Sequence, residues 1–194
     1  MGINYQKARF EASYGTVEQL PAPTAPEVSF AGRSNAGKSS LLNKLLNRKA
    51  LAKVSSTPGK TANINFFDVD GVKFVDLPGY GFAKVGQAER QRWADLIGGY
   101  FDQERSFNLV VVLVDIRLDA QKLDVDMIEF LREGEYPFLI ALTKADKLKR
   151  GRQISNRQKL AKQFGIDIEQ MVITSAKDGT GIPEIRKRIE DACL

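Results

Sequence analysis

The chain has 194 residues, a formal net charge of +5, one cysteine and no histidine. Histidine-based catalytic triads, histidine-bound zinc and imidazole acids or bases are therefore excluded, and the single Cys193 permits neither an intrachain disulfide nor a cysteine metal cluster. The length predicts a single main domain, and 43% hydrophobic residues predict that it folds into a globule.

The N-terminal part differs from the rest in its pattern. Residues 1–20 show no clear hydrophobic period, and residues 21–26 contain three prolines. We expect a stiff linker there, so that residues 1–26 form an N-terminal extension and residues 27–194 the main domain. The start of the chain lacks a secretory apolar stretch, and the longest apolar run, residues 109–114, is too short to cross a bilayer. These features predict a cytoplasmic protein without a membrane partner.

Hydrophobic spacing predicts the elements of the main domain. In chain order they are a strand at 27–31, a helix from residue 37, strands at 64–69 and 72–76, a helix at 93–101, a strand at 109–114, a helix at 123–131, a strand at 137–142, a helix at 154–164, a strand at 171–174 and a helix at 182–189. Asp70-Gly71 joins the second and third strands as a hairpin signal. The alternation predicts an α/β fold, a mostly parallel sheet with helices on both faces.

A glycine-rich motif links the first strand to the first helix. Residues 32–39, Gly-Arg-Ser-Asn-Ala-Gly-Lys-Ser, fit the G-x-x-x-x-G-K-S pattern of a phosphate-binding loop. Such a loop turns backbone amides toward phosphate oxygens, and the start of the helix adds positive potential. Lys38 would face the outer phosphates, and the Ser39 hydroxyl would bind Mg²⁺. An unrelated glycine turn is the alternative, which the position between strand and helix disfavours.

A second motif, Asp76-Leu77-Pro78-Gly79, ends the hairpin. Beside a phosphate loop, the Asp76 carboxylate would hold Mg²⁺ through water and the Gly79 amide would meet a γ-phosphate; alone, the motif would be only a turn. A threonine that reaches both Mg²⁺ and the γ-phosphate is predicted just before the hairpin. Thr61 is preferred to Thr57, because Thr57 precedes a proline and is expected to shape the turn.

Two further motifs predict recognition of guanine. Thr143-Lys144-Ala145-Asp146 follows a strand and fits the pattern Asn-Lys-x-Asp, in which the Asp146 carboxylate accepts two hydrogen bonds from guanine and adenine presents the wrong donors. Thr143 replaces the usual asparagine; its hydroxyl can still bond the loop backbone, so we expect the change to affect affinity more than base choice. Residues 175–177, Ser-Ala-Lys, follow the last strand and would back the base.

In this order the motifs resemble a Ras-like GTPase domain over residues 27–192. Their wording, with Thr-Pro-Gly-Lys-Thr at 57–61, Asp-Leu-Pro-Gly-Tyr-Gly at 76–81 and Thr-Lys-Ala-Asp-Lys-Leu at 143–148, resembles the EngB (YihA/YsxC) family of bacterial GTPases. The resemblance implies a mixed six-stranded sheet, binding of GTP and GDP, a role in large ribosomal subunit assembly and an association with septum formation in cell division.

The motifs and the resemblance together imply a set of site residues. Catalysis is expected from Lys38, Thr61 and Gly79, and magnesium binding from Ser39, Thr61 and Asp76. The residues expected to bind the nucleotide are Gly32, Arg33, Ser34, Asn35, Ala36, Gly37, Lys38, Ser39, Ser40, Gly59, Lys60, Thr61, Asp76, Leu77, Pro78, Gly79, Thr143, Lys144, Ala145, Asp146, Ser175, Ala176 and Lys177.

Tyr80 occupies the position at which Ras-like enzymes carry a water-orienting glutamine. A phenol with a pKa of about 10 is a poor base, so slow intrinsic hydrolysis is expected. As one compensation, Asn35 is hypothesised to help bind K⁺ against the phosphates, the alternative being that it only shapes the loop. Tyr80 and Phe82 are also expected to face a partner. The loops at 53–61 and 79–91 are expected to order around the γ-phosphate and Mg²⁺.

The positive charge is concentrated in one segment. Residues 144–162 carry eight lysines and arginines against Asp146, a local charge of +7, whereas residues 102–135 carry −5. The hypothesis is contact with ribosomal RNA phosphates on a large-subunit precursor; the alternative is a solvated helix face. We expect a monomer. The competing functions are an ATPase or small-molecule kinase on the same loop, and a nucleotide-gated RNA-binding scaffold in which hydrolysis is incidental.

Overall fold

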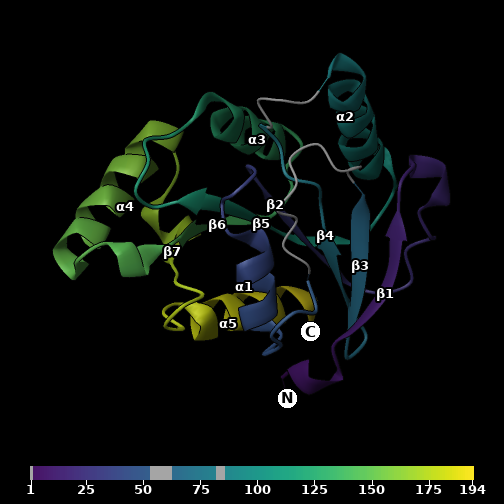
Figure 1. Cartoon of the computed structure of the whole chain (residues 1–194), viewed down its shortest axis with the longest axis horizontal. Helices are drawn as coiled ribbons and strands as arrows, with labels where there is room; N and C mark the ends of the chain where they lie inside the picture. The colour runs from purple at the N-terminus through teal and green to yellow at the C-terminus, as the bar shows by residue number, and fades with distance from the viewer. Residues whose placement is uncertain (1, 53–62, 82–85) are drawn as a thin grey trace.

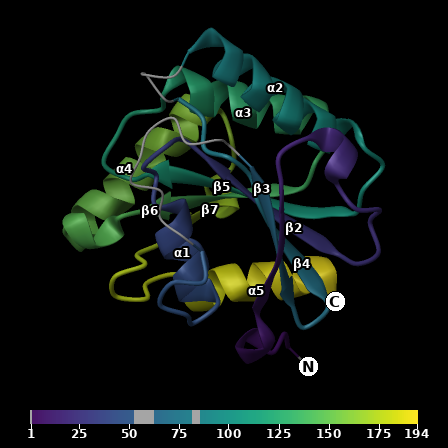
Figure 2. The same ribbon diagram turned by 45° about the vertical axis from the view of Figure 1, so that its right-hand side comes forward.

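A central sheet with helices on both faces organises the molecule (Figure 1). The computed structural model describes residues 2–52, 63–81 and 86–194. One face of the sheet is covered by α1 (Lys38–Leu45) and α5 (Ile182–Cys193), and the other by α2 (Gln87–Asp102), α3 (Lys122–Glu133) and α4 (Arg150–Phe164), as Figure 2 also shows. The α/β class and the three layers that the sequence predicts are confirmed.

Within the described residues, the sheet has seven strands in the order β1-β3-β4-β2-β5-β6-β7. Their bounds are β1 Arg9–Tyr14, β2 Glu27–Gly32, β3 Ile64–Val69, β4 Val72–Asp76, β5 Phe107–Asp115, β6 Phe138–Thr143 and β7 Met171–Ile173. Short 3-10 helices lie at Tyr5–Lys7, Val17–Gln19, Ala145–Lys147 and Ile168–Gln170. The β1–β3 and β3–β4 pairs are antiparallel and the other pairs are parallel.

The prediction of six strands is wrong by one strand. Residues 9–14 lie in the expected N-terminal extension, yet they form β1 and pair with β3 at the edge of the sheet. Residues 9–14, Arg-Phe-Glu-Ala-Ser-Tyr, alternate polar and apolar side chains, which is the period of a strand, so a short signal was present in the sequence. The register shifts between Phe10 and Ala12, and no β1 residue is fully buried. The division of the chain after residue 26 stays a prediction.

The central strands carry apolar side chains to both faces. In β5, Val110, Val112 and Val114 pack toward α2, α3 and α4, whereas Val111 and Leu113 pack toward α1 and α5. Burial on both faces explains why this strand reads as an unbroken apolar run. The hairpin turn between β3 and β4 has positive φ at Asp70 (53°) and Gly71 (88°), as a two-residue type I′ turn requires.

The prediction of a loop from residue 79 to 91 is wrong at its end. Helix α2 begins at Gln87, and the amide of Arg90 already donates to the carbonyl of Gly86 at 3.2 Å. The first turn of α2 is built from good helix formers, although it lacks the apolar stripe that marks residues 93–101. Among the helices of the described ranges, none is both long and apolar enough to cross a membrane.

Parallel pairing brings the carboxyl ends of four strands to one edge of the sheet. Gly32, Asp76, Asp115 and Thr143 end β2, β4, β5 and β6 there. Ligands in open α/β sheets bind at this edge. The phosphate loop, the Asp76–Gly79 motif and the Thr143–Asp146 motif begin at the ends of β2, β4 and β6, and Ser175–Lys177 follows β7.

Candidate nucleotide-binding site

The phosphate loop has the backbone of an anion cradle. It leaves β2 at Gly32 and enters α1 at Lys38, with Asn35 and Gly37 at φ values of 68° and 92°. Gly37 precedes the first residue of α1 in the left-handed conformation, which costs glycine no strain. Because the first amides of a helix have no partner within it, the start of α1 presents donors and a positive dipole to the loop.

Lys38 and Asp76 form an ion pair at the floor of this loop. Lys38 Nζ donates to Asp76 Oδ1, and both side chains are largely buried, with 14% and 9% of their areas exposed. Asn65, on β3, also donates to Asp76, at 3.4 Å between Nδ2 and Oδ2. The structure thus brings together two residues predicted for the outer phosphates and the metal, and it adds Asn65, which the sequence analysis missed.

The segment after β4 runs parallel to the phosphate loop and is bonded to it. The Tyr80 amide donates to the Gly32 carbonyl at 3.1 Å, and the Ser34 amide and hydroxyl both donate to the Tyr80 carbonyl, at 2.7 and 3.1 Å. A Cβ at Gly79 would lie 3.4 Å from the backbone nitrogen and Cα of Ser34. Gly79 therefore lies directly against the phosphate loop, where its amide is predicted to meet a γ-phosphate.

The expectation that Tyr80 faces a partner is wrong. Its side chain is buried, with 5% of the residue exposed, and its hydroxyl donates to Asp124 Oδ1 on α3 at 2.7 Å. Burial and the nearby Asp124 charge raise the pKa of Tyr80 far above its ordinary value. Asp124 is itself 3% exposed, so one of the acidic residues in the negative 102–135 segment is buried. Phe82 lies outside the described residues.

Residues 143–146, predicted to recognise guanine, form a loop that we call the guanine-reading loop. Thr143 and Lys144 connect it to the phosphate loop, residues 32–39. Thr143 Oγ1 donates to the carbonyl of Ala36 at 2.7 Å, and Lys144 Nζ donates to the carbonyl of Asn35 at 2.6 Å. Lys144 Nζ also lies 3.5 Å from Asp115 Oδ2. The hydroxyl that replaces the usual asparagine therefore still holds the loop backbone.

The guanine-reading loop is also bonded to the Ser175–Lys177 loop. Asp146 Oδ1 accepts from the Ser175 hydroxyl at 2.8 Å, and the Ala145 amide donates to the Thr174 carbonyl at 3.0 Å. Ser175 Oγ in turn accepts from the amide of Lys177 at 3.2 Å. These bonds orient Asp146, the carboxylate predicted to read guanine.

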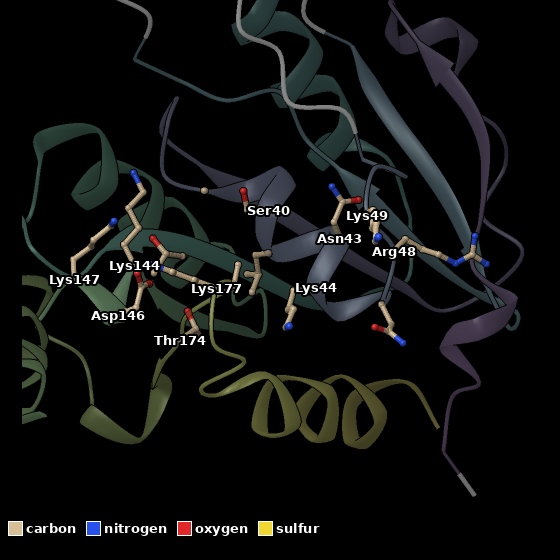
Figure 3. A pocket seen from close by; sticks show the side chains of 15 residues that line it. Ser40, Asn43, Lys44, Arg48, Lys49, Lys144, Asp146, Lys147, Thr174 and Lys177 are labelled. Carbon is tan, nitrogen blue, oxygen red and sulfur yellow. The ribbon is translucent and has the colours of Figure 1, made fainter. Parts of the chain in front are cut away.

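A cavity of about 690 Å³ opens between these loops and α1 (Figure 3). Figure 3 shows Lys144, Asp146, Lys147 and Thr174 grouped at one end, with Lys44 on α1 and Arg48 beyond the end of that helix. The predicted residues that line it are Gly37, Ser40, Thr143, Lys144, Asp146, Ala176 and Lys177. Its volume lies within the range of small-ligand pockets.

Several lining residues escaped the sequence analysis: Asn43, Lys44, Asn47, Arg48, Lys49, Lys147 and Thr174. Ser40 and Lys44 lie four positions apart on α1 and so share one helix face, a spacing that the sequence already shows. Arg48 also donates to the carbonyls of Gln6 and Ala8, at 2.8 and 3.0 Å, and so connects this end of α1 to the N-terminal residues.

The remaining predicted site residues are buried residues, Ser39 and residues that the structure does not describe. Ala36, Leu77, Pro78 and Ala145 have buried side chains, so only their backbone atoms are available to a nucleotide. Ser39 is the second residue of α1, beside Lys38. The switch residues Thr57, Gly59, Lys60 and Thr61 lie outside the described residues.

Comparisons with known proteins agree with this geometry. A family described as 50S ribosome-binding GTPase matches residues 27–144. A relative from Prosthecochloris aestuarii, named a probable GTP-binding protein EngB, is 45% identical over 97% of this chain and 98% of the relative. Another with the same name, from Chlorobaculum tepidum, is 53% identical over 76% of this chain and 77% of the relative. The crystal structure of a probable GTP-binding protein engB superposes with a TM-score of 0.72 at 27% identity, covering 86% of this chain and 97% of that one.

Proposed function

The chain belongs to the EngB family of GTP-binding proteins, and on that premise we propose that it is a GTP-dependent switch in assembly of the large ribosomal subunit, with slow hydrolysis of GTP unless a partner activates it. One observation carries this proposal: exposed cations begin directly after the guanine-reading loop, and Gln153, on the α4 helix that carries two of them, donates to the Ala145 carbonyl within that loop. The description of the matching family, 50S ribosome-binding GTPase, supports such a partner. Membership in a GTP-binding family favours GTP over the ATPase or small-molecule kinase alternative.

The phosphate contacts are proposed to follow from the observed ion pair. When GTP binds, Lys38 exchanges Asp76 for the outer phosphates, while the loop amides and Gly79 donate to phosphate oxygens. Ser39 and Asp76, with Thr61, supply the hard oxygen donors that Mg²⁺ prefers, and the ion would neutralise phosphate charge. The Asp146 carboxylate accepts hydrogen bonds from the guanine edge, while the Ser175 hydroxyl donates to Asp146 Oδ1.

Slow hydrolysis is proposed because Tyr80 occupies the position of the water-orienting glutamine. The Tyr80 side chain is buried and its hydroxyl donates to Asp124, so it does not take the place of a glutamine that orients water. We propose Asn35, which is exposed at the tip of the loop, as a K⁺ ligand against the phosphates. Faster GTP turnover in KCl than in NaCl, lost in Asn35→Ala, is the expected result; equal rates in both salts would contradict it.

The basic face consists of Lys147, Lys149, Arg150 and Arg152, all of them exposed. Two other cations of the 144–162 segment contact other parts of the protein. Arg157 donates to the carbonyls of Ile168 and Met171, at 2.8 and 2.9 Å, and Lys159 pairs with Asp119 at 2.8 Å. The proposed RNA contact is therefore limited to residues 147–152, at and just before the start of α4.

Gln153 bonds the basic face to the guanine-reading loop. Its Nε2 donates to the carbonyls of Ala145 and Leu148, at 2.7 and 3.0 Å. Ala145 lies between the lysine and the aspartate that are predicted to contact the base. A change in this loop on nucleotide binding therefore reaches the first turn of α4, which is how we propose that the nucleotide state changes RNA affinity.

Co-sedimentation with large ribosomal subunit precursors, in GDP and in a non-hydrolysable GTP analogue, tests the proposal. We expect nucleotide-dependent binding that weakens, with a flatter salt dependence, when Lys149, Arg150 and Arg152 are changed to glutamate; Lys147 is kept because it also lines the nucleotide cavity. A control with the same change in charge replaces three exposed cations elsewhere: Lys7, Arg90 and Lys187. Equal losses in both variants, or binding that ignores the nucleotide, would contradict the proposal. In Lys38→Ala, retained binding without nucleotide dependence would favour a scaffold.

Four further properties remain proposals. We propose that the chain is a monomer in the cytoplasm and that residues 1–26 extend a GTP-binding domain at 27–194. A role in septum formation during cell division is proposed from the family resemblance, as a consequence of the switch in ribosome assembly. Depletion of the protein should therefore produce subunit precursors before septation fails.

A further inference from the structure

Side chains from two helices hold the backbone on either side of Gly79. Trp93 Nε1, on α2, donates to the carbonyl of Pro78 at 3.0 Å, and the Tyr80 hydroxyl donates to Asp124 Oδ1, on α3, at 2.7 Å. The rings of Tyr80 and Trp93 also meet edge to face, with 5.9 Å between their centroids. Gly79 thus lies between two anchored neighbours.

The contact between Tyr80 and Asp124 is buried and charged. Burial raises the pKa of Asp124, against the opposing effects of the Tyr80 hydrogen bond and the Arg33 charge. Burial also raises the pKa of Tyr80, so its phenol stays a donor at neutral pH. Arg33 Nε is buried, and no hydrogen-bond acceptor reaches it from the parts of the chain that the structure describes. Buried hydrogen bonds to charged groups are among the stronger ones in proteins.

These anchors act on the phosphate loop through the backbone. Tyr80 donates its amide to Gly32 and accepts from the Ser34 amide and hydroxyl. Because Gly79 precedes Tyr80 and lies against Ser34, a shift of the phenol would move the Gly79 amide relative to the loop.

We propose that Asp124 and Trp93 are positioning residues that fix the Gly79 amide and so set the affinity of the chain for GTP relative to GDP. The inference rests on the proposed contact of the Gly79 amide with the γ-phosphate. GDP lacks this phosphate, so loosening the anchors weakens GTP binding and leaves GDP binding nearly unchanged. A donor that is already oriented binds more tightly than one that must be ordered first.

Tyr80→Phe and Tyr100→Phe form a matched pair of variants. Tyr100 is a fully buried phenol that contacts Ser29 Oγ at 2.7 Å and Glu27 Oε2 at 2.9 Å, at the opposite end of β2 from the phosphate loop. Each variant loses one buried phenol hydroxyl beside a buried carboxylate. The Kd of a non-hydrolysable GTP analogue relative to that of GDP should rise about tenfold in Tyr80→Phe, from a hydrogen bond to a charged group, and should stay unchanged in Tyr100→Phe.

Variants of Asp124 separate positioning from folding. Asp124→Asn keeps an acceptor for the phenol, so its Kd for the GTP analogue relative to that for GDP should stay close to the value of the parent protein. In Asp124→Ala this ratio should rise as it does in Tyr80→Phe. Trp93 is the only tryptophan of the chain, so its fluorescence reports on the Pro78–Tyr80 segment directly. Quenching of Trp93 by acrylamide should increase in Asp124→Ala and remain as in the parent protein in Asp124→Asn.

A ratio that changes equally in the two tyrosine variants, or in neither, would overturn the inference. The measurements use the purified full chain with nucleotides alone, so they are independent of the ribosome. A shifted ratio in a protein that ignores ribosomal subunits would contradict only the proposed function. An unshifted ratio in a protein that binds subunits in a nucleotide-dependent way would contradict only the positioning role.

Discussion

The hydroxyl of Thr143 provides the sharpest test of how the two halves of the site are joined. Thr143 is 5% exposed, and its Oγ1 donates to the carbonyl of Ala36 in the phosphate loop at 2.7 Å. Valine has nearly the same shape but no donor, so Thr143→Val leaves a buried carbonyl without this partner, at a cost of about 1–3 kcal/mol. We expect that loss in the free energy of unfolding, measured with urea.

The same substitution should weaken nucleotide binding, because GDP is proposed to contact both of the loops that this bond joins. If about 1–2 kcal/mol of the bond is used in holding the loops for GDP, the Kd for GDP rises about 5- to 30-fold. Isothermal titration of the purified protein with GDP measures this change.

Thr174→Val is the matched control. Thr174 is fully buried, and its Oγ1 donates to the carbonyl of Leu142 at 2.9 Å, but the Thr174 amide donates to the same carbonyl at 2.7 Å. The control therefore removes a buried threonine hydroxyl without opening the link between the loops. Equal GDP affinities in the two valine variants would refute the idea that Thr143 couples base recognition to the phosphate loop.

Three other predictions concern buried ionisable groups. Arg105→Met should lower the free energy of unfolding by about 3–5 kcal/mol, because Arg105 and Glu27 pair at 2.7 Å with 1% exposure and loss of one leaves the other charge buried. Burial would raise the pKa of Asp115, but hydrogen bonds from Arg117 lower it overall. A lowered pKa stabilises the folded state above the pKa of the unfolded chain, so Asp115→Asn should unfold more easily than the parent at pH 7. The difference in the free energy of unfolding should disappear as pH falls below about 4. Burial raises the pKa of Cys193 to about 11, so iodoacetamide at pH 8 should alkylate the folded chain on the order of 100-fold more slowly than the urea-unfolded chain.

The order of strands and helices could be predicted because local patterns determine it. The leucines of α1, the alternating faces of β5 and the Asp70-Gly71 turn each have a periodicity or turn chemistry that acts within a few residues. Strand β1 was not predicted, because the alternation of residues 9–14 spans only six positions without a fully buried side chain, and the strand is defined by pairing with β3, 50 or more residues farther along the chain.

The site shows the same division between local and distant information. Phosphate-loop residues fall within one motif, so their proximity to one another follows from sequence spacing. The burial of Tyr80 and Asp124 depends on α3 packing against the segment after β4, and nothing in the local sequence of either residue marks it. A carboxylate in a helix of mixed charge reads as surface until the residue opposite it is known.

Internal pairing of the charges in the site has a consequence for its affinity. Lys38 is paired with Asp76, and Lys144 with Asp115 and the Asn35 carbonyl, before any nucleotide is considered. Binding therefore exchanges one set of charge contacts for another, and the gain is the difference between them. A single added phosphate is then a large fraction of that difference. Under the proposed switch, a site whose lysines have internal partners would respond more strongly to the loss of one phosphate than a site whose lysines had none.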